Sequence, residues 1–352
     1  MQEIILKNNK IFSKGREINA NEALFLMELQ NAKCVEQKEK IKKEISIFEL
    51  IKKKKINLQE YFFYRDARLR GFNVFEKEKE EEKEKKEEKG GKKIEELEIK
   101  SKKIKKRINP FEGIFLKESL VTLVKDEKIA KRVYKDFWFG QYATYKQPKI
   151  GKLNKLDIFE TLFLVEKKKL KVNLKKEEIL NLANKKIKNF LLLYQIFKDW
   201  RNNDFVVKSG FKFGCDFRIY PSTSPNKNVH SKYVLHLLPK EKTKVSEISR
   251  AIRVAHSVRK KFILAIPKAK SIKTKTFFLK KEKNNFLAIY FFEQGEIDFR
   301  RLLFLIKKAK ELNARPILAI VDRETSVTYY TLRKIKLRSK NFDYFEIDWI
   351  RP

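Results

Sequence analysis

Three side chains in the second half of the sequence, Tyr220, His230 and Lys260, are of types that together can cleave RNA without a metal ion. In that reaction the ribose 2′-hydroxyl loses a proton, the 5′ leaving oxygen gains one, and the phosphorane between them carries extra negative charge. A tyrosine is a poor base near its ordinary pKa of about 10 unless nearby cations lower that pKa. A histidine can donate a proton near neutral pH, and a lysine can stabilise the developing charge.

The segment that carries Tyr220 and His230 has the pattern of short strands and a loop. Residues 206–220, "VVKSGFKFGCDFRIY", predict two strands around a glycine turn, with Tyr220 at the end of the second. The Pro/Ser/Asn stretch 221–229 predicts a loop, and "HSKYVLHLLP" predicts a returning strand that His230 begins. The apolar surroundings of His236, six residues into that strand, favour a structural role for it.

The next stretch, "SRAIRVAHSVRKKFILAI", predicts an amphipathic helix followed by a buried strand. Apolar residues at helical spacing predict its core face: Ile248, Ala251, Ile252, Ala255 and Val258. Arg253 and Lys260 are seven residues apart, nearly two turns, and so share another side, with His256 beside them. The pattern alone favours a solvated basic face for the two cations and a polar contact at the core edge for His256.

Together, "VVKSGFKFGCDFRIY", "HSKY" and "RVAHSVRKKFILAI" resemble the archaeal tRNA-splicing endonucleases. The order and spacing of Tyr220, His230 and Lys260 fit that family's catalytic tyrosine, histidine and lysine. The resemblance implies metal-independent cleavage of precursor tRNA at bulge–helix–bulge junctions, with a 2′,3′-cyclic phosphate, a 5′-hydroxyl and no cofactor. It also implies that Tyr220 is the general base, His230 the general acid and Lys260 the stabiliser of the transition state.

The resemblance extends to RNA binding. Arg253 matches a family arginine that stacks on a bulge base in a cation–π clamp. The second arginine of that clamp has no clear counterpart, although Lys275 and Lys280 lie nearby in "IKTKTFFLKK".

The charge of the chain is consistent with a polyanionic partner. The 352 residues include 84 Lys and Arg against 46 Asp and Glu, a formal net charge of +38. The mixed-charge run 76–107 predicts a solvated linker, and the other 320 residues still carry +35 without it. A surface this positive favours nucleic acid, although a lysine-rich proteome would give the same composition.

The remaining composition indicates a cytosolic protein without a metal site. The two cysteines, Cys34 and Cys215, lack metal spacing and are typical of a reducing compartment. The N-terminal sequence lacks the apolar core of a signal peptide, and the apolar run at 286–292 has the length of a strand. We therefore expect a cytoplasmic location and no membrane partner.

Two pairs of similar segments indicate an internal duplication. "EALFLME" at 22–28 resembles "ETLFLVE" at 160–166, and "YRDARLRGFNV" at 64–74 resembles "FKDWRNNDFVV" at 197–207. "FILAI" at 262–266 and "PILAIVD" at 316–322 each end a helix-and-strand pattern.

From these repeats we expect an α+β fold, in which helical N-terminal subdomains accompany small mixed sheets flanked by helices. The expected domains are a non-catalytic N-terminal partial unit (1–75), the linker (76–107), the N-terminal subdomain of the catalytic unit (108–200), the catalytic subdomain (201–270) and a C-terminal structural half-unit (271–352). This order resembles the three-unit endonucleases of ultrasmall archaea, which implies a homodimer with two active sites. In that family an acidic loop of one chain docks onto the catalytic unit of the other, and Asp322 and Glu324 in the turn 321–328 match that loop.

Two other functions remain open. The first is a non-catalytic RNA-binding subunit that depends on a separate active chain, against which the complete triad argues. The second is a DNA nuclease of restriction-like fold, which needs a group of metal-binding carboxylates that the sequence does not display.

Overall fold

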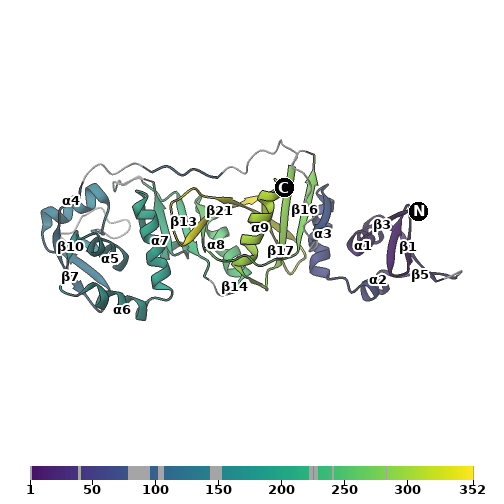
Figure 1. Ribbon diagram of the computed structural model, residues 1–352, viewed down its shortest axis with the longest axis horizontal. Helices are drawn as coiled ribbons and strands as arrows, with labels where there is room; N and C mark the ends of the chain where they lie inside the picture. The colour runs from purple at the N-terminus through teal and green to yellow at the C-terminus, as the bar shows by residue number, and fades with distance from the viewer. Residues whose placement is uncertain are drawn as a thin grey trace.

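The computed structural model describes residues 2–38, 41–77, 96–101, 107–142, 153–221, 225, 229–239, 242–282 and 284–351. The molecule is elongated, with a large sheet in its middle and a smaller lobe at each end (Figure 1). Helices and strands alternate and mix throughout, which confirms the α+β class.

In the described residues, ten strands form the central sheet, in the order β11-β12-β13-β15-β21-β20-β19-β17-β16-β6. Neighbouring strands are antiparallel except for two parallel pairs, β13 with β15 and β17 with β19. The bounds are β6 (Asn73–Lys77), β11 (Val206–Ser209), β12 (Phe217–Tyr220), β13 (Tyr233–Leu237), β15 (Lys261–Pro267), β16 (Thr276–Lys281), β17 (Asn284–Phe292), β19 (Arg315–Val321), β20 (Val327–Lys334) and β21 (Phe342–Ile350).

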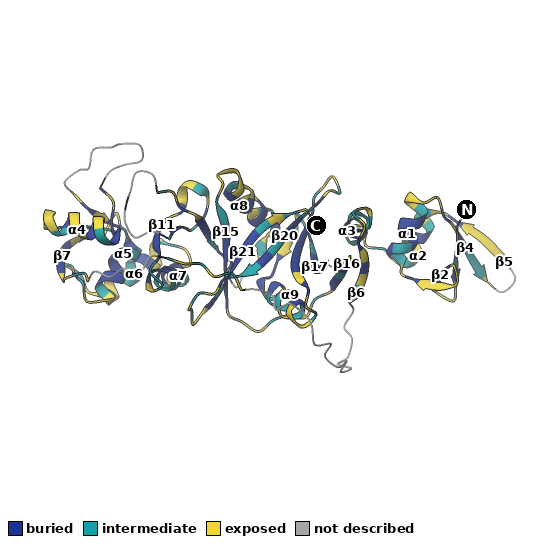
Figure 2. Ribbon diagram, turned by 90° about the horizontal axis from the view of Figure 1, so that it is seen from above, coloured by how far each residue is buried: buried dark blue, intermediate teal, exposed yellow. Residues whose placement is uncertain are grey.

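Helices cover both faces of this sheet. Parallel neighbours need a crossover, and α8 (Val245–Ser257) and α9 (Phe299–Glu311) supply it for the two parallel pairs. Both helices pack on the same face, where their apolar stripes form one core with β13, β15, β17 and β19. On the other face, α7 (Phe190–Asn202) packs near the β11 edge and α3 (Leu58–Leu69) near the β6 edge. The central strands are accordingly mostly buried, and exposed residues gather on the outer sides of the helices (Figure 2).

The two lobes lie at opposite ends of the sheet (Figure 1). One is built on the sheet β3-β2-β1-β4-β5, with strands β1 (Glu3–Lys7), β2 (Lys10–Ser13), β3 (Arg16–Ile18), β4 (Lys33–Lys38) and β5 (Ile41–Ile45) and helices α1 (Ala20–Leu29) and α2 (Ile47–Lys54). The other is built on β10-β7-β8-β9, with strands β7 (Phe111–Leu116), β8 (Val121–Val124), β9 (Lys155–Leu156) and β10 (Leu170–Lys171) and helices α4 (Glu127–Phe137), α5 (Ile158–Glu166) and α6 (Lys176–Lys186).

Short elements complete the chain. The 3-10 turn η1 (Phe211–Phe213) joins β11 to β12, and the two-residue strands β14 (Thr243–Lys244) and β18 (Glu296–Ile297) pair ahead of α8 and α9. In the charged run, Leu97 pairs with the end of β20: its N–H donates to the Lys334 oxygen at 2.8 Å and its oxygen accepts from the Lys336 N–H at 3.0 Å. In the described residues, no helix is long and apolar enough to cross a membrane.

Most expected elements are present, but the N-terminal subdomains expected to be helical each contain a sheet, and the expected small sheets are joined in one. Two boundaries also differ from the sequence pattern. The returning strand begins at Tyr233, so His230 lies three residues before β13 rather than at its start. The helix that carries Arg253 ends at Ser257, and Arg259, in the left-handed region with φ 54°, turns the chain toward β15. Lys260 therefore lies beside a strand and not on the helix face of Arg253. The periodic pattern of apolar residues could not locate the end of this helix, because no glycine directly follows it in the sequence.

Candidate active site

The sheet brings Tyr220, Lys260 and the segment of His230 to one edge. Ile219 of β12 pairs with Tyr233 of β13, and Tyr233 pairs with Lys261 of β15. Tyr220 is the last residue of β12 and Lys260 is the residue before β15. The two therefore lie side by side across the sheet, with the start of β13 between them. Neighbouring strands are about 4.8 Å apart, so two spacings separate the backbones of Tyr220 and Lys260. His230 is exposed on the segment that enters β13 between them.

Ser231 connects these groups. Lys260 Nζ donates a hydrogen bond to the main-chain oxygen of Ser231 at 2.7 Å, and the Ser231 side chain lies near enough to Tyr220 to lower the pKa of that phenol. Ser231 is buried although its neighbour His230 is exposed. The entry to β13 is thus fixed on one side by the lysine and lies next to the tyrosine on the other.

The surroundings shift the pKa values of Tyr220 and Lys260. Burial raises the pKa of Tyr220, while the charge of Arg218 and the nearby Ser231 hydroxyl act in the opposite direction. Burial also lowers the pKa of Lys260, and the charge of Arg218 lowers it further. The Arg218 guanidinium is 5.9 Å from the centre of the Tyr220 ring.

Arg218 was not singled out from the sequence, although strand alternation contained the signal. Arg218 and Tyr220 are two residues apart on β12 and therefore point to the same face of the sheet. Phe213 of η1 was also missed, and Lys260 Nζ is 5.2 Å from the centre of its ring. No sequence pattern could have found that contact, because it depends on how η1 folds back toward α8.

A pocket of about 310 Å³ lies beside Lys260. Three further basic or titratable residues line it, namely His256, Arg259 and Lys261, together with Asp348. His256 is mostly exposed, and its Nδ1 is 4.0 Å from Asp348. The polar contact expected for His256 is therefore present, to Asp348 on β21.

The predicted RNA-binding residues have different environments. Arg253 is exposed on α8, on the side away from the core. Lys275 is exposed but already paired, since its Nζ is 2.9 Å from Glu60 and also contacts Glu76. Lys280 lies on β16 opposite Asn73. Among the described residues, no contact places Lys275 or Lys280 next to Arg253.

The predicted acidic loop is the turn between β19 and β20. Asp322 Oδ1 accepts hydrogen bonds from the N–H groups of Glu324 and Ser326, both at 2.9 Å, and so closes the turn. The Glu324 side chain is exposed. Arg65 of α3 donates to Thr325 Oγ1 at 3.1 Å, which ties this turn to the N-terminal part of the chain.

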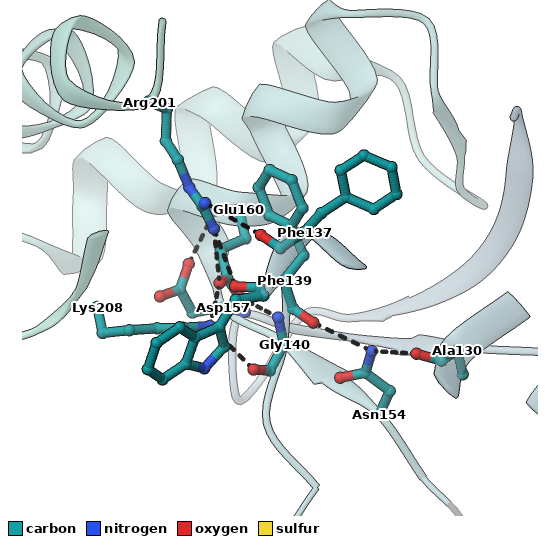
Figure 3. A network of polar contacts seen from close by, with 10 residues as sticks. Ala130, Phe137, Phe139, Gly140, Asn154, Asp157, Glu160, Arg201 and Lys208 are labelled. Carbon is teal, nitrogen blue, oxygen red and sulfur yellow. Dashed lines mark hydrogen bonds and ion pairs between the residues drawn. The ribbon is translucent and has the colours of Figure 1, made fainter. Parts of the chain in front are cut away.

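Glu160, Arg201 and Lys208 form a buried ion cluster. Glu160 Oε1 is 2.6 Å from Lys208 Nζ and 3.7 Å from Arg201 Nη2, and the side chains of Glu160 and Arg201 are each 2% exposed (Figure 3). Burial lowers the pKa of both cations, that of Arg201 to about 10. Asp157, which caps α5 beside the cluster, has its pKa raised to about 7 by burial and by the charge of Glu160.

No group of three or more histidine, cysteine, aspartate or glutamate side chains suited to hold a metal ion occurs within the described part of the chain. The residues gathered at the sheet edge are a phenol, an imidazole and cations. They can exchange protons with a substrate and stabilise negative charge on it.

Comparisons with known proteins place this site within a family. Residues 190–274 match the model of the tRNA intron endonuclease catalytic C-terminal domain, and residues 113–184 match the model of the N-terminal domain. The tRNA-splicing endonuclease of Pyrobaculum islandicum is 33% identical over 160 residues, which are 42% of this chain and 87% of that protein. That of Pyrobaculum aerophilum is 34% identical over 158 residues, 42% of this chain and 86% of that protein.

A longer relative is matched over a smaller share of its length. The tRNA-splicing endonuclease of Methanococcoides burtonii is 32% identical over 163 residues, 44% of either chain. The catalytic-domain match spans Tyr220, His230 and Lys260, and it follows the N-terminal-domain match directly. Since the chain also covers more than four fifths of the Pyrobaculum proteins, it belongs to the tRNA intron endonuclease family.

Proposed function

We propose that this chain is an RNA endonuclease that removes introns from precursor tRNA at bulge–helix–bulge junctions without a metal ion. The observation that carries the proposal is the shared sheet edge: Tyr220 and Lys260 flank the entry to β13, where Lys260 binds the Ser231 oxygen next to His230, within the segment that matches the catalytic domain. The names of the relatives supply the substrate class, a tRNA.

In the proposed reaction Tyr220 accepts the proton of the 2′-hydroxyl. The 2′-oxygen attacks the adjacent phosphorus, a bond from phosphorus to the 2′-oxygen forms, and the bond to the 5′-oxygen breaks. His230 donates a proton to the departing 5′-oxygen, which leaves as a hydroxyl, and the phosphate remains as a 2′,3′-cyclic diester. Lys260 stabilises the extra charge of the phosphorane. Arg218 favours the phenolate form of Tyr220, against the effect of burial.

Binding of the RNA follows from charge and stacking. The net charge of +38 attracts the phosphate backbone. Arg253, exposed on α8, is proposed to stack its planar guanidinium on an extruded bulge base.

We further propose that the chain is internally duplicated, with 1–75 and 271–352 together forming one unit and 108–270 the other, joined by the linker 76–107. Equivalent side chains make equivalent contacts in support of this. Tyr329 donates to Asp66 and Tyr344 donates to Asp199, each at 2.8 Å. Glu28 binds Tyr61 and Arg65 on α3, just as Glu166 binds Tyr194 and Lys198 on α7.

The duplication bears on assembly. The first unit has no histidine and so cannot supply a second triad. By resemblance to the three-unit enzymes of ultrasmall archaea, we propose a homodimer in which Asp322 and Glu324 of one copy dock on the catalytic unit of the other. The exposed side chain of Glu324, at the tip of a tightly closed turn, supports this role.

The test is incubation of the purified chain with a bulge–helix–bulge RNA in excess EDTA, followed by analysis of the product ends. Cleavage at the junctions with 2′,3′-cyclic phosphate and 5′-hydroxyl ends is expected. RNA binding without cleavage, with activity only after a second protein is added, would instead identify a non-catalytic subunit. Cleavage that EDTA abolishes would contradict the mechanism.

A further inference from the structure

The Trp138 ring packs against the ring of Tyr220. Its ring centre is 4.7 Å from that of Tyr220, with 49° between the ring planes. Trp138, Val206 and Tyr220 form a small buried cluster of their own, separate from the main cores of the described residues. Trp138 comes from the end of α4 in the outer lobe, whereas Tyr220 belongs to the central sheet. The lobe thus contributes a side chain to the site.

The backbone conformation of Trp138 is unusual. It ends α4 in the left-handed region, with φ 50° and ψ 47°. Large L-residues adopt this region rarely, and such conformations persist only where surrounding contacts enforce them. The N–H of Trp138 still bonds the Tyr134 oxygen at 2.9 Å, so the helix end is closed.

The buried ion cluster supplies the enforcing contacts (Figure 3). Arg201 donates to the oxygen of Phe137 at 3.3 Å and to that of Trp138 at 3.0 Å. The N–H of Gly140 donates to Glu160 at 3.0 Å, and the Gly140 oxygen accepts from Lys208 at 2.9 Å. The cluster therefore holds the backbone at Phe137 and Trp138 and again at Gly140, two residues after Trp138.

Two further contacts restrict the same segment. Asn154 Nδ2 donates to the Phe139 oxygen at 3.2 Å, and the Arg201 guanidinium lies 3.9 Å from the centre of the Phe139 ring. Gly140 has φ +83°, and a Cβ there would come 1.7 Å from Asn154 Oδ1. The chain can make this turn beside Asn154 only with a glycine.

Stability alone does not account for these buried charges. Desolvation of ions is costly, and well-packed apolar side chains of similar volume often stabilise a fold at least as well. The alternative use of such a group is to enforce one specific arrangement, and here the arrangement that it enforces is the position of Trp138.

The other half of the proposed duplication lacks both the cluster and the tyrosine. Glu22, the counterpart of Glu160, pairs at 3.4 Å with Arg16, whose side chain is 74% exposed. Phe75 replaces Lys208 and is exposed, and Arg68, the counterpart of Arg201, lies over the Phe25 ring.

The tyrosine position in that half is filled by a lysine. Lys280 pairs with Asn73 in the same register in which Tyr220 pairs with Val206. The ion cluster is thus present in the half that has the tyrosine and missing from the half that does not. This distribution ties the cluster to the site rather than to the fold.

We propose that Trp138 is a positioning residue for Tyr220 and that the buried ion cluster holds Trp138 in place. The indole covers one side of the phenol, excludes water there and fixes the direction of its oxygen toward the 2′-hydroxyl. This rests on the proposed function, in which Tyr220 is the base. A misplacement of about 1 Å in a catalytic group can cost about 100-fold in rate.

The test compares Trp138→Leu, which keeps apolar volume without a ring, with Trp138→Phe, which keeps a ring. Single-turnover cleavage of a bulge–helix–bulge RNA gives the chemical rate, and binding of the same RNA with a 2′-deoxy junction gives Kd. We expect Trp138→Leu to lower the rate by about 10- to 100-fold with Kd changed less than about 3-fold, and Trp138→Phe to recover most of the rate. Glu160→Gln, which weakens the cluster without changing its shape, should also lower the rate.

Trp200→Phe is the matched control. Trp200 is fully buried against Phe205 and Tyr344, in a different core from Tyr220. It should lower Tm without changing the single-turnover rate, when all variants are assayed well below their Tm. Trp138→Leu at the wild-type rate, or no difference between the Leu and Phe variants, would overturn the inference.

The same set of variants separates this inference from the proposed function. Tyr220→Phe at the wild-type rate would remove the assigned base and with it the basis of the inference. Loss of cleavage in Tyr220→Phe alongside full activity in both Trp138→Leu and Glu160→Gln would overturn only the role of Trp138.

Discussion

The main-chain oxygen of Ser231 accepts a hydrogen bond from Lys260 Nζ at 2.7 Å. This bond links two segments that are 29 residues apart, one entering β13 and the other entering β15. Because Ser231 follows His230 directly, the lysine fixes the backbone from which the imidazole projects. The position of the proposed acid therefore depends on the lysine that is proposed to stabilise the charge.

Replacement of the proposed acid is expected to separate cleavage from binding. His230→Ala should lower the single-turnover cleavage rate by about 100- to 10,000-fold. Its affinity for the RNA should stay close to that of wild type, because one exposed imidazole adds little to an interface dominated by lysine and arginine. His236→Ala is the control, since His236 lies within β13 beside Asp216 and not at the sheet edge. A His230→Ala rate equal to that of the control would remove His230 from the mechanism.

The planarity of Arg253 is expected to matter more than its charge. Arg253→Lys keeps the charge but loses the flat guanidinium, so cleavage of a bulged RNA should fall by about 10-fold. An RNA with an abasic site at the bulge should be cut equally by both proteins, because there is no base to stack on. Arg250→Lys, exposed on the same helix, is the control. If Arg253→Lys and Arg250→Lys behave alike on the bulged RNA, Arg253 belongs to a solvated basic face.

The acidic turn is expected to hold two copies together. Sedimentation of the wild type should give about twice the chain mass of 42.2 kDa. Asp322→Lys with Glu324→Lys should shift the mass toward the monomer and lower cleavage, because a charge that loses its partner in an interface stays desolvated. Since Asp322 also closes the turn, Glu324→Lys alone is the cleaner variant. An unchanged dimer of both variants at low micromolar concentration would show that these acids do not form the contact.

Asp157 is expected to make stability depend on pH. Its pKa is raised to about 7 in the folded chain, against about 4 in an unfolded one, so the folded state binds the extra proton between these values. The stabilisation linked to that proton is full below pH 4 and is lost as pH rises toward and through 7. Asp157→Asn keeps a capping side chain but cannot ionise. The Tm of wild type relative to Asp157→Asn should therefore fall as pH rises from 4 to 8.

The N-cap of α4 provides the control for that measurement. Asp126 accepts from the Ile129 N–H at 2.7 Å on the protein surface, so Asp126→Asn reports the loss of an ordinary exposed capping carboxylate. The same pH-dependent difference in both variants would contradict the assignment to Asp157.

The order of elements around the site could be read from the sequence, because local patterns determine it. The glycine turn between β11 and β12, the apolar stripe of α8 and the strand that begins at Lys261 all follow from short periodic patterns. The contacts of Ser231, Arg218 and Trp138 could not be read in this way. They depend on strand register and on the packing of the α4 lobe, whose Trp138 comes 82 residues before Tyr220.

The buried ion cluster illustrates the same limit. Glu160 and Arg201 lie in segments recognised as repeats, and their counterparts Glu22 and Arg68 look equivalent in sequence. Only the folded chain shows that one pair is buried with Lys208 and that the other is not. In the first copy Phe75 stands at the position of Lys208 and is exposed.

The central claim is that the 2′-hydroxyl next to the scissile phosphate is the nucleophile, and a single 2′-deoxy substitution tests it most directly. A bulge–helix–bulge RNA with that one change at one junction should bind normally and be cut only at the other junction, because the attacking group is absent. Cleavage at the substituted junction at the rate of the unmodified RNA would mean that water attacks instead, and it would contradict the roles proposed for Tyr220, His230 and Lys260.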